Sequence, residues 1–186
     1  MSTIDYIKNF IRDKDVASIT PSSSFLVKRV CKKIDYSEPR VIVEYGPGTG
    51  VFSEYLLQHL KPGSKLILIE KNEGFVEILE EMAEDPRVLL YQDSAENVAD
   101  ILKDAGEDVA DYVLSGIPFS FLSDEVRTEL IRETRRVLGP DGRFLVYQNY
   151  NHMEKPLREH FDHVTKEYEL LNIPPMYAYE AMMLDR

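Results

Sequence analysis

The chain has 186 residues, a formal net charge of −11 and 44% hydrophobic residues. This length and composition allow one domain with a substantial core, and no apolar run approaches the roughly 20 residues that a membrane-spanning helix needs. The acidic charge makes nucleic acid an unlikely main partner, because an acidic surface repels phosphates.

The first 40 residues differ in charge from the rest of the chain. They carry eight Lys or Arg against five Asp or Glu, a balance of +3, so the remaining 146 residues hold −14. Residues 4–11 and 22–34 each show apolar side chains at helical spacing. The opposite face of the second pattern is basic, with Lys28, Arg29, Lys32 and Lys33. We expect residues 1–36 to form helices that cover the chain's own core, close over a substrate as a lid, or contact an anionic membrane.

The start of the chain, Met-Ser-Thr-Ile-Asp-Tyr, lacks the charged and then apolar layout of a signal peptide. The single cysteine, Cys31, has no partner for an internal disulfide, and we expect it to pack as a small hydrophobic residue. These features predict a cytoplasmic location, with membrane association as an alternative that depends on the N-terminal helices.

An apolar strand predicted at residues 41–45 runs directly into the loop Gly46-Pro-Gly-Thr-Gly50, and a helical pattern follows at 51–60. Glycines let the backbone approach a ligand closely, and the first amides of a helix are free to donate hydrogen bonds. The third glycine comes two positions after the second, whereas a dinucleotide fingerprint needs three. The spacing therefore disfavours NAD and FAD.

The second predicted strand, residues 65–70, ends in Glu70, about 20 residues after the glycines, which suits a carboxylate that accepts hydrogen bonds from both ribose hydroxyls. The third, residues 87–91, leads to Asp93 and Ser94. Asp93 by itself also fits a simple helix N-cap. Together with the glycine loop, these positions predict a ribose-bearing ligand without a pyrophosphate.

Helical patterns and apolar strands continue to alternate, as in a doubly wound α/β sheet. Further helices are predicted at 73–84, 95–104, 124–138 and 154–161, and further strands at 110–115, 143–149, 163–172 and 178–185. Between two of these elements, Gly139 is expected to end the preceding helix in the left-handed conformation. Ligands of open α/β sheets bind beyond the carboxyl ends of the strands, so Ser115 to Phe119 should line the cavity, with Phe119 available to stack on a ring.

In order and spacing, Glu44-Tyr-Gly-Pro-Gly-Thr-Gly50, Glu70 and Asp93-Ser94 resemble the S-adenosylmethionine site of class I methyltransferases. The resemblance covers roughly residues 16–186 and implies one domain over 1–186, with a Rossmann-like core at 37–186. It also implies a seven-stranded sheet with an antiparallel last strand, and S-adenosylmethionine as cofactor. The implied cofactor-binding residues are Glu44, Gly46, Pro47, Gly48, Thr49, Gly50, Glu70, Lys71, Asp93, Ser94, Ser115, Gly116, Ile117 and Pro118.

Two further segments point to a subfamily. Ser115-Gly-Ile-Pro118 looks like the Ser-Gly-Leu-Pro signature of bacterial phospholipid N-methyltransferases, and Ile19-Thr-Pro-Ser-Ser-Ser24 resembles the Pro-Ser-Ser segment that opens that family's core. Adenine amino-methyltransferases carry Asn where this chain has Gly116. The resemblance implies methyl transfer to the amine of a phospholipid headgroup such as phosphatidylethanolamine. The alternatives are another small amine, rRNA adenine as in the related rRNA adenine dimethyltransferases, or a non-catalytic S-adenosylmethionine-binding module.

Such an amine has a pKa near that of lysine, about 10, so the site must favour its neutral form. Tyrosines can hold an ammonium group by cation–π attraction until it loses its proton. Our catalytic candidates are Tyr45, Ser115, Tyr147, Tyr177 and Tyr179. A headgroup phosphate near His152, Lys155 and Arg158 is an alternative role for the last helix. The histidines lack metal-ligand support, and no metal is expected.

Overall fold

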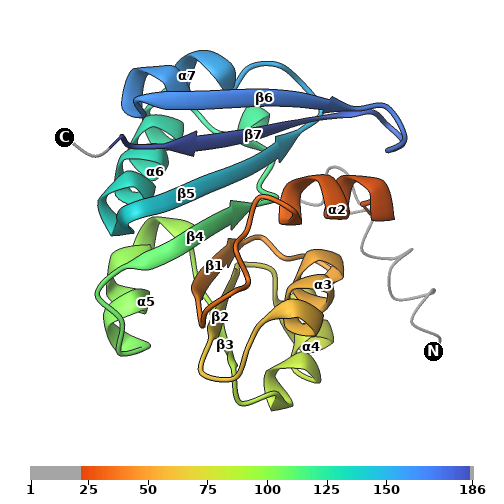
Figure 1. Ribbon diagram of the computed structural model, residues 1–186, viewed down its shortest axis with the longest axis vertical. Helices are drawn as coiled ribbons and strands as arrows, with labels where there is room; N and C mark the ends of the chain where they lie inside the picture. The colour runs from red at the N-terminus through yellow and green to blue at the C-terminus, as the bar shows by residue number, and fades with distance from the viewer. Residues whose placement is uncertain (1–21, 185–186) are drawn as a thin grey trace.

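The computed structural model describes residues 22–184, whose centre is a seven-stranded sheet (Figure 1). The strand order is β3-β2-β1-β4-β5-β7-β6. Strands β1 to β5 are parallel, whereas β7 runs antiparallel to both of its neighbours. The strands are β1 (Val41–Tyr45), β2 (Lys65–Glu70), β3 (Val88–Gln92), β4 (Ala110–Ser115), β5 (Leu138–Gln148), β6 (His163–Glu169) and β7 (Met176–Met182). The predicted Rossmann-like sheet with an antiparallel last strand is confirmed.

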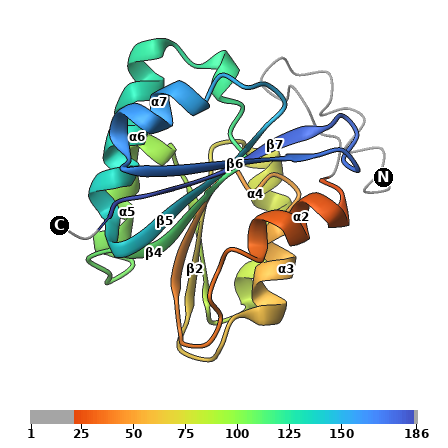
Figure 2. The same ribbon diagram turned by 45° about the horizontal axis from the view of Figure 1, so that its top comes forward.

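Helices cover both faces of the sheet (Figure 2). One face carries α2 (Ser24–Cys31), α3 (Val51–His59) and α4 (Glu73–Leu79), and the other carries α5 (Val98–Asp104), α6 (Asp124–Val137) and α7 (Glu154–His160). Short 3-10 turns are η1 (Met82–Glu84), η2 (Ala95–Asn97) and η3 (Phe119–Phe121). None of the helices within residues 22–184 is both long and apolar enough to cross a bilayer.

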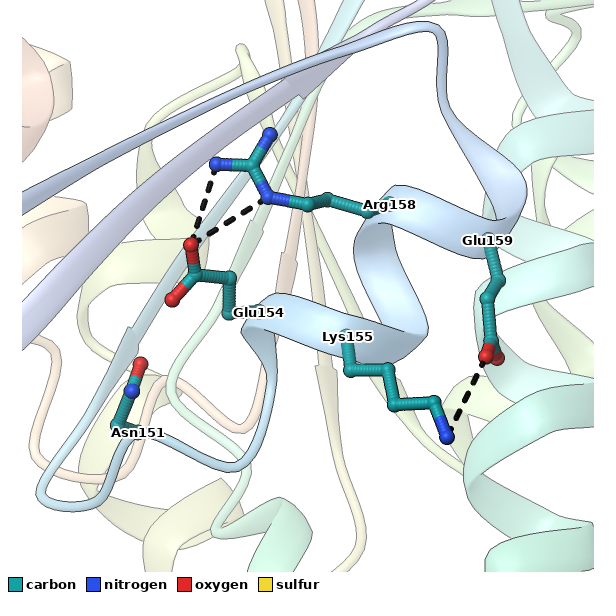
Figure 3. A pocket seen from close by; sticks show the side chains of 5 residues that line it. All are labelled: Asn151, Glu154, Lys155, Arg158 and Glu159. Carbon is teal, nitrogen blue, oxygen red and sulfur yellow. Dashed lines mark hydrogen bonds and ion pairs between the residues drawn. The ribbon is translucent and has the colours of Figure 1, made fainter.

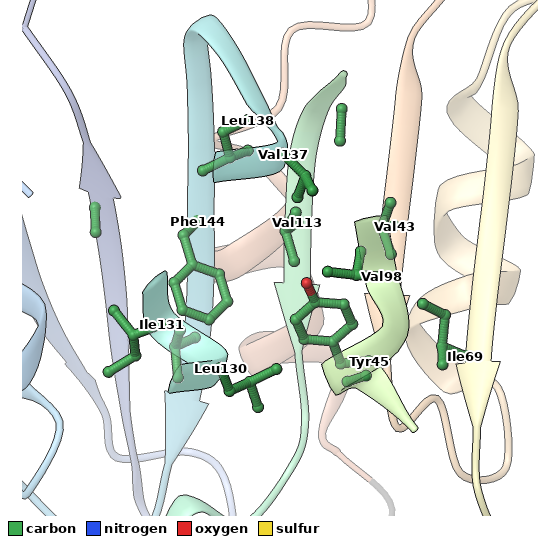
Figure 4. Packing of buried hydrophobic residues seen from close by; sticks show 14 of the residues in the cluster. Val43, Tyr45, Ile69, Val98, Val113, Leu130, Ile131, Val137, Leu138 and Phe144 are labelled. Atoms are coloured by element: carbon green, nitrogen blue, oxygen red, sulfur yellow. The ribbon is translucent and has the colours of Figure 1, made fainter. Parts of the chain in front are cut away.

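Strand β1 shows how one segment serves both faces. Successive side chains of a strand point to opposite sides, so Val43 and Tyr45 pack beneath α5 and α6, as Figure 4 shows, while Ile42 packs beneath α2 and α3. Glu44 also points to the α3 side, where it meets Ser53. A charged residue therefore stands in an otherwise apolar strand at the end of the sheet where ligands bind.

Helix α2 belongs to the helical layer of the sheet. Ser23 caps it by accepting a hydrogen bond from the Leu26 amide at 3.3 Å, and its apolar face is buried. Arg29 on the polar face pairs with Glu167 and Glu169 of β6 at 2.7 and 2.6 Å. Lys33 pairs with Glu167 and with Glu180 of β7. Both cations form ion pairs within the chain. Less of the basic face is therefore available to an anionic membrane than the sequence suggested.

The amphipathic pattern at residues 4–11 lies outside the described residues. Cys31 is buried in α2, as expected of a small hydrophobic residue.

The prediction for Gly139 was wrong. Gly139 is absent from the glycines of residues 22–184 with positive φ. Helix α6 ends at Val137, and its C-cap residue Leu138 has an extended backbone, φ −74° and ψ 135°. The reason is tertiary: Leu138 already pairs with Ala110 of β4, so β5 begins five residues earlier than the expected position 143. A register irregularity between Ala110 and Tyr112 accommodates the extra residues.

Candidate functional site

The loop between β1 and α3 lies at the carboxyl edge of the sheet. Gly46, Gly48 and Gly50 all have left-handed backbones, with φ of 62°, 58° and 81°. The Gly46 amide donates to the Ile69 carbonyl at 2.9 Å, which fixes the loop against β2. A Cβ added at Gly48 would meet no atom within 4 Å, so this glycine faces open space. At this point the loop has exposed backbone that a ligand could approach closely. Pro47 is buried and Thr49 is half-buried within the same turn.

Glu70 ends β2 beside the glycine loop. Its Oε2 accepts a hydrogen bond from the Gly48 amide at 3.2 Å, and its Oε1 accepts one from the Asn72 amide at 2.9 Å. These bonds aim the carboxylate at the loop, and burial raises its pKa. The arrangement joins the two positions that the sequence spacing predicted to serve one ligand. Lys71, the next residue, is exposed.

Glu44 is fully buried next to the loop. The Ser53 hydroxyl donates to its Oε2 at 2.6 Å, but its Oε1 has no hydrogen-bond partner. Burial raises the pKa of Glu44 to about 7, and the charge of Glu70 adds to the effect. A buried carboxylate oxygen without a donor is costly, so a ligand that supplies an N–H group would satisfy it.

Asp93 and Ser94 follow β3, beside the end of β2. Asp93 accepts hydrogen bonds from the Ser94 amide at 2.6 Å and from the Asn97 side chain at 2.8 Å. Ser94 is the N-cap of η2. Both residues therefore organise the turn, and they stand at the same edge as Glu70, because Glu70 and Gln92 are paired in register.

The segment after β4 abuts the glycine loop. A Cβ at Gly46 would lie 3.2 Å from the Ile117 side chain. Ser115 is buried at the end of β4, where its hydroxyl accepts a hydrogen bond from the Ile117 amide at 3.3 Å. Ile117 and Pro118 are half-buried. The structure thus brings the first and fourth strand ends together, as predicted.

The expected role of Phe119 was wrong. Its side chain is fully buried and packs edge-on against Phe144 of β5, so it is not available to stack on a ligand. The turn η3 directs Phe119 inward and leaves Phe121 exposed.

Gln148, which no sequence pattern singled out, holds this segment in place. Its Oε1 accepts a hydrogen bond from the Phe119 amide at 3.1 Å, and its Nε2 donates to the Ile117 carbonyl at 2.7 Å. Both partners lie about thirty residues earlier in the chain, and a single buried glutamine at a strand end has no local signature.

Gly116 and Tyr147 are in close contact. A Cβ at Gly116 would lie 2.3 Å from the Tyr147 hydroxyl and 3.2 Å from the Gly46 carbonyl oxygen. Tyr147 is 9% exposed and stacks on Phe52 of α3, with ring centroids 4.4 Å apart. Its hydroxyl therefore occupies the space that a side chain at position 116 would need, and it brings β5 to the same point as β1 and β4.

The other tyrosine candidates lie on the opposite face of the sheet. Tyr45 is buried in the core, and its hydroxyl is 3.1 Å from the Thr134 hydroxyl of α6. Tyr179 donates to Asn151 at 2.9 Å. Tyr177 is half-buried, with its ring centroid 4.6 Å from that of Tyr168. The structure does not gather the five catalytic candidates. Tyr147 is the tyrosine among them that contacts the Gly116 segment, and Ser115 lies in that segment.

A cavity of about 380 Å³ lies on α7 and is lined by charged residues (Figure 3). Its cations are paired, since Arg158 contacts Glu154 at 3.1 Å and Lys155 contacts Glu159 at 3.8 Å. Glu154 also binds Lys166. The cavity therefore has little net positive charge with which to attract the headgroup phosphate that the sequence suggested for Lys155 and Arg158.

The loop and its surroundings fit S-adenosylmethionine. The unpartnered Glu44 Oε1 would accept from the amino group of the methionine part, Gly48 leaves room beside the loop, and Glu70, which lies against the loop, would accept hydrogen bonds from the ribose hydroxyls. Within residues 22–184, no three His, Cys, Asp or Glu side chains are grouped to hold a metal ion.

Solved structures share this fold. Precorrin-6y C5,15-methyltransferase from Geobacter metallireducens has a TM-score of 0.69 and 16% identity, covering 92% of this chain and 95% of that one. An S-adenosylmethionine-dependent methyltransferase from Aquifex aeolicus has a TM-score of 0.65 and 13% identity, covering 99% and 100%.

Sequence comparison identifies the family. A family model described as a methyltransferase domain matches residues 42–142. The ornithine lipid N-methyltransferase of Singulisphaera acidiphila is 31% identical over 180 residues, which cover 92% of this chain and 91% of that protein. Ribosomal RNA small subunit methyltransferase A of Thermotoga neapolitana is 32% identical over 123 residues, covering 64% of this chain and 44% of that protein. The chain therefore belongs to the class I methyltransferases, enzymes that use S-adenosylmethionine as cofactor.

Proposed function

We propose that this enzyme transfers methyl groups to the primary amine of a membrane lipid headgroup, such as that of phosphatidylethanolamine or an ornithine lipid. The observation that carries the proposal is the match to an ornithine lipid N-methyltransferase over nearly the full length of both chains. The Ser115-Gly-Ile-Pro118 segment supports the same conclusion, because it adjoins the glycine loop where an acceptor must approach.

RNA is the weaker candidate substrate. The match to a ribosomal RNA methyltransferase covers 44% of that protein, and this chain carries a net charge of −11. The contact between Gly116 and Tyr147 adds a geometric argument. Adenine amino-methyltransferases place Asn at the position of Gly116, whereas here any side chain at 116 would collide with the tyrosine hydroxyl.

The cofactor supplies an electrophilic methyl group on a sulfonium centre. The protein must hold the acceptor amine in line with that group and favour its neutral form. Tyr147 and Ser115 are the residues we propose for this task, because they lie at or beside the Gly116 segment. Burial keeps the pKa of Tyr147 well above its usual value, so its hydroxyl stays neutral and can donate or accept a hydrogen bond.

The hydroxyls of Tyr45 and Tyr179 are already engaged with Thr134 and Asn151. We propose packing roles for these two residues. Tyr177 sits near the end of β5, opposite Gln148, and we propose it as a residue at the rim of the acceptor site.

The test compares methyl acceptors in one assay. The full chain is incubated with methyl-labelled S-adenosylmethionine and, in separate arms, phosphatidylethanolamine vesicles, ornithine lipid vesicles, free ethanolamine and total RNA. We expect label in a lipid arm, and none with Glu70→Ala, which removes the acceptor beside the glycine loop. Label confined to RNA or free ethanolamine would overturn the proposal, and cofactor binding without labelling of any pool would indicate a non-catalytic module.

A further inference from the structure

The exposed apolar side chains are unevenly distributed. Within residues 22–184, seven large apolar side chains are more than half exposed, and Leu184 is the only one of them at the amino edge of the parallel strands. The other six lie at the carboxyl edge, where the glycine loop is: Phe25, Phe121, Tyr150, Leu170, Leu171 and Ile173. Three of these form the turn between β6 and β7, which extends beyond the sheet next to the start of α2 (Figure 1). We call Leu170, Leu171, Ile173 and Phe25 the apolar tip.

The tip inverts the usual arrangement of a surface turn. Asn172 is 2% exposed whereas Ile173 is 79% exposed. Asn172 is held inside by two hydrogen bonds of 2.7 Å, one from the Ser23 amide and one to the Pro174 carbonyl. A turn in contact with water normally shows its polar side chain and hides its apolar ones. This turn does the opposite, so its outer surface suits an apolar phase.

Buried charges hold the base of the tip in place. The Glu169 side chain is 5% exposed, accepts a hydrogen bond from the Leu171 amide at 2.9 Å and pairs with Arg29 of α2. The turn is thus tied to the last turn of α2 through Glu169 and to the N-cap of α2 through Asn172. These polar contacts hold the turn in a conformation that exposes its apolar side chains.

The tip is also free of charge. The ten residues 170–179 contain no charged side chain, although 30% of the chain is Asp, Glu, Lys or Arg. Of the four cations on or directly after α2, Arg29 and Lys33 are engaged with Glu167, Glu169 and Glu180, and Lys28 and Lys32 are exposed. An uncharged apolar surface on an acidic protein is suited to insertion between lipids and poorly suited to electrostatic attraction to anionic headgroups.

The tip is connected to the candidate site by two adjacent residues. Ser23 donates its amide to the Asn172 side chain at 2.7 Å, and Ser22, the residue before it, is near enough to the Tyr147 hydroxyl to lower its pKa against the larger effect of burial. Tyr147 in turn contacts the Gly116 segment. A membrane that received the tip would therefore contact the protein on the side where the acceptor amine must enter.

We propose that the apolar tip inserts into the interfacial region of a lipid bilayer and so places the carboxyl edge of the sheet against the headgroups. The choice of a lipid bilayer as the binding partner of the tip rests on the proposed function, in which the methyl acceptor is a lipid. It assigns membrane contact to apolar side chains of the β6–β7 turn and α2, instead of to the basic face of α2.

The test measures sedimentation of the full chain with phosphatidylcholine–phosphatidylethanolamine vesicles. The triple variant Leu170→Ser, Leu171→Ser and Ile173→Ser should lose about tenfold or more in partitioning, because each change removes apolar surface from the lipid. The matched control replaces exposed apolar residues at the other edge, Val109→Ser with Leu184→Ser, and should bind as the unchanged protein does. Raising NaCl from about 0.1 to about 0.5 M should alter binding little, since screening acts on charges.

Unchanged vesicle binding by the triple variant would overturn the proposal, as would loss of binding in high salt. Sedimentation velocity without lipid tests a second copy of the chain as the occupant. If the unchanged protein self-associates and the triple variant does not, the tip is a protein interface and the proposal fails.

Methylation of a short-chain aminolipid dispersed as monomers separates this proposal from the proposed function. The unchanged protein and the triple variant should methylate the monomeric lipid at equal rates. The triple variant should be slower only when the lipid is presented in vesicles. If neither protein methylates any lipid, the proposed function fails, while the sedimentation result still decides where the membrane binds.

Discussion

Replacing Gly116 with Ala should destabilise the protein through Tyr147. The added Cβ would lie 2.3 Å from the Tyr147 hydroxyl oxygen, 2.9 Å from the ring carbon that bears it, and 3.2 Å from the Gly46 carbonyl. Gly116 is not among the glycines with positive φ, so its backbone conformation accepts alanine without strain. Any cost must therefore come from contact with these neighbours.

Tyr147 has little room to move away. Its ring stacks on Phe52 at 4.4 Å with an interplanar angle of 15°, and 9% of the residue is exposed. Overpacking a tight site of this kind costs about 1–3 kcal/mol. Displacing the hydroxyl or the Gly46 carbonyl should also disturb the glycine loop, so methyl transfer should fall further than stability alone explains.

A double-mutant cycle isolates this contact. Urea unfolding of Gly116→Ala, Tyr147→Leu and the double variant should give a coupling free energy of about 1–2 kcal/mol, because leucine removes both the hydroxyl and the ring carbon. Gly139→Ala is the control. Its Cβ would approach no atom closer than 3.4 Å, so it should change stability little. If the two effects add within about 0.5 kcal/mol, positions 116 and 147 are not in contact and this prediction is wrong.

Three further changes test the site and the ion pair between α2 and β6. Glu44 has a pKa of about 7 when folded, against about 4.5 as an ordinary carboxyl, so the folded chain keeps a proton that the unfolded chain loses between these pH values. The contribution of Glu44 to stability should therefore fall by at most about 3 kcal/mol as the pH rises through this window and stay level above it. In urea unfolding at successive pH values, Glu44→Gln should make this slope shallower, and the raised pKa of Glu70 should leave a smaller slope of the same sign. Gln148→Ala should lower kcat about tenfold or more with little effect on cofactor affinity, because it frees the segment after β4 and leaves Glu70 in place; equal loss of cofactor affinity would count against this role. Arg29→Ala should cost about 1–3 kcal/mol, because Glu169 loses a charged hydrogen-bond donor in a partly buried pair, whereas the exposed Lys28→Ala should be nearly neutral; similar unfolding midpoints for both would show that the ion pair contributes little.

The parallel strands were readily predicted because their local pattern and their tertiary setting agree. The segments at 41–45, 65–70 and 110–115 are apolar, β-rich and bounded by turn residues, and they are strands over those residues. The placement of Glu70 beside the glycine loop also followed from sequence, since carboxyl ends of neighbouring parallel strands meet at one edge.

The features that sequence missed depend on contacts between distant residues. The early start of β5 comes from the pairing of Leu138 with Ala110, and the role of Gln148 comes from partners about thirty positions away. Phe119 is buried because it begins a 3-10 turn, and no residue pattern in the sequence predicts that turn. The basic face of α2 looked free because its carboxylate partners lie well over a hundred residues later, on β6 and β7.

Calorimetric titration of the folded chain with S-adenosylhomocysteine, the demethylated product, measures whether the glycine loop and Glu70 hold the cofactor. We expect saturable binding at one site, weakened about tenfold or more in Glu70→Gln, which keeps the shape of the side chain but removes its charge. A folded protein that gives no saturable heat, or a Glu70→Gln variant that binds as tightly as the unchanged chain, would contradict this expectation.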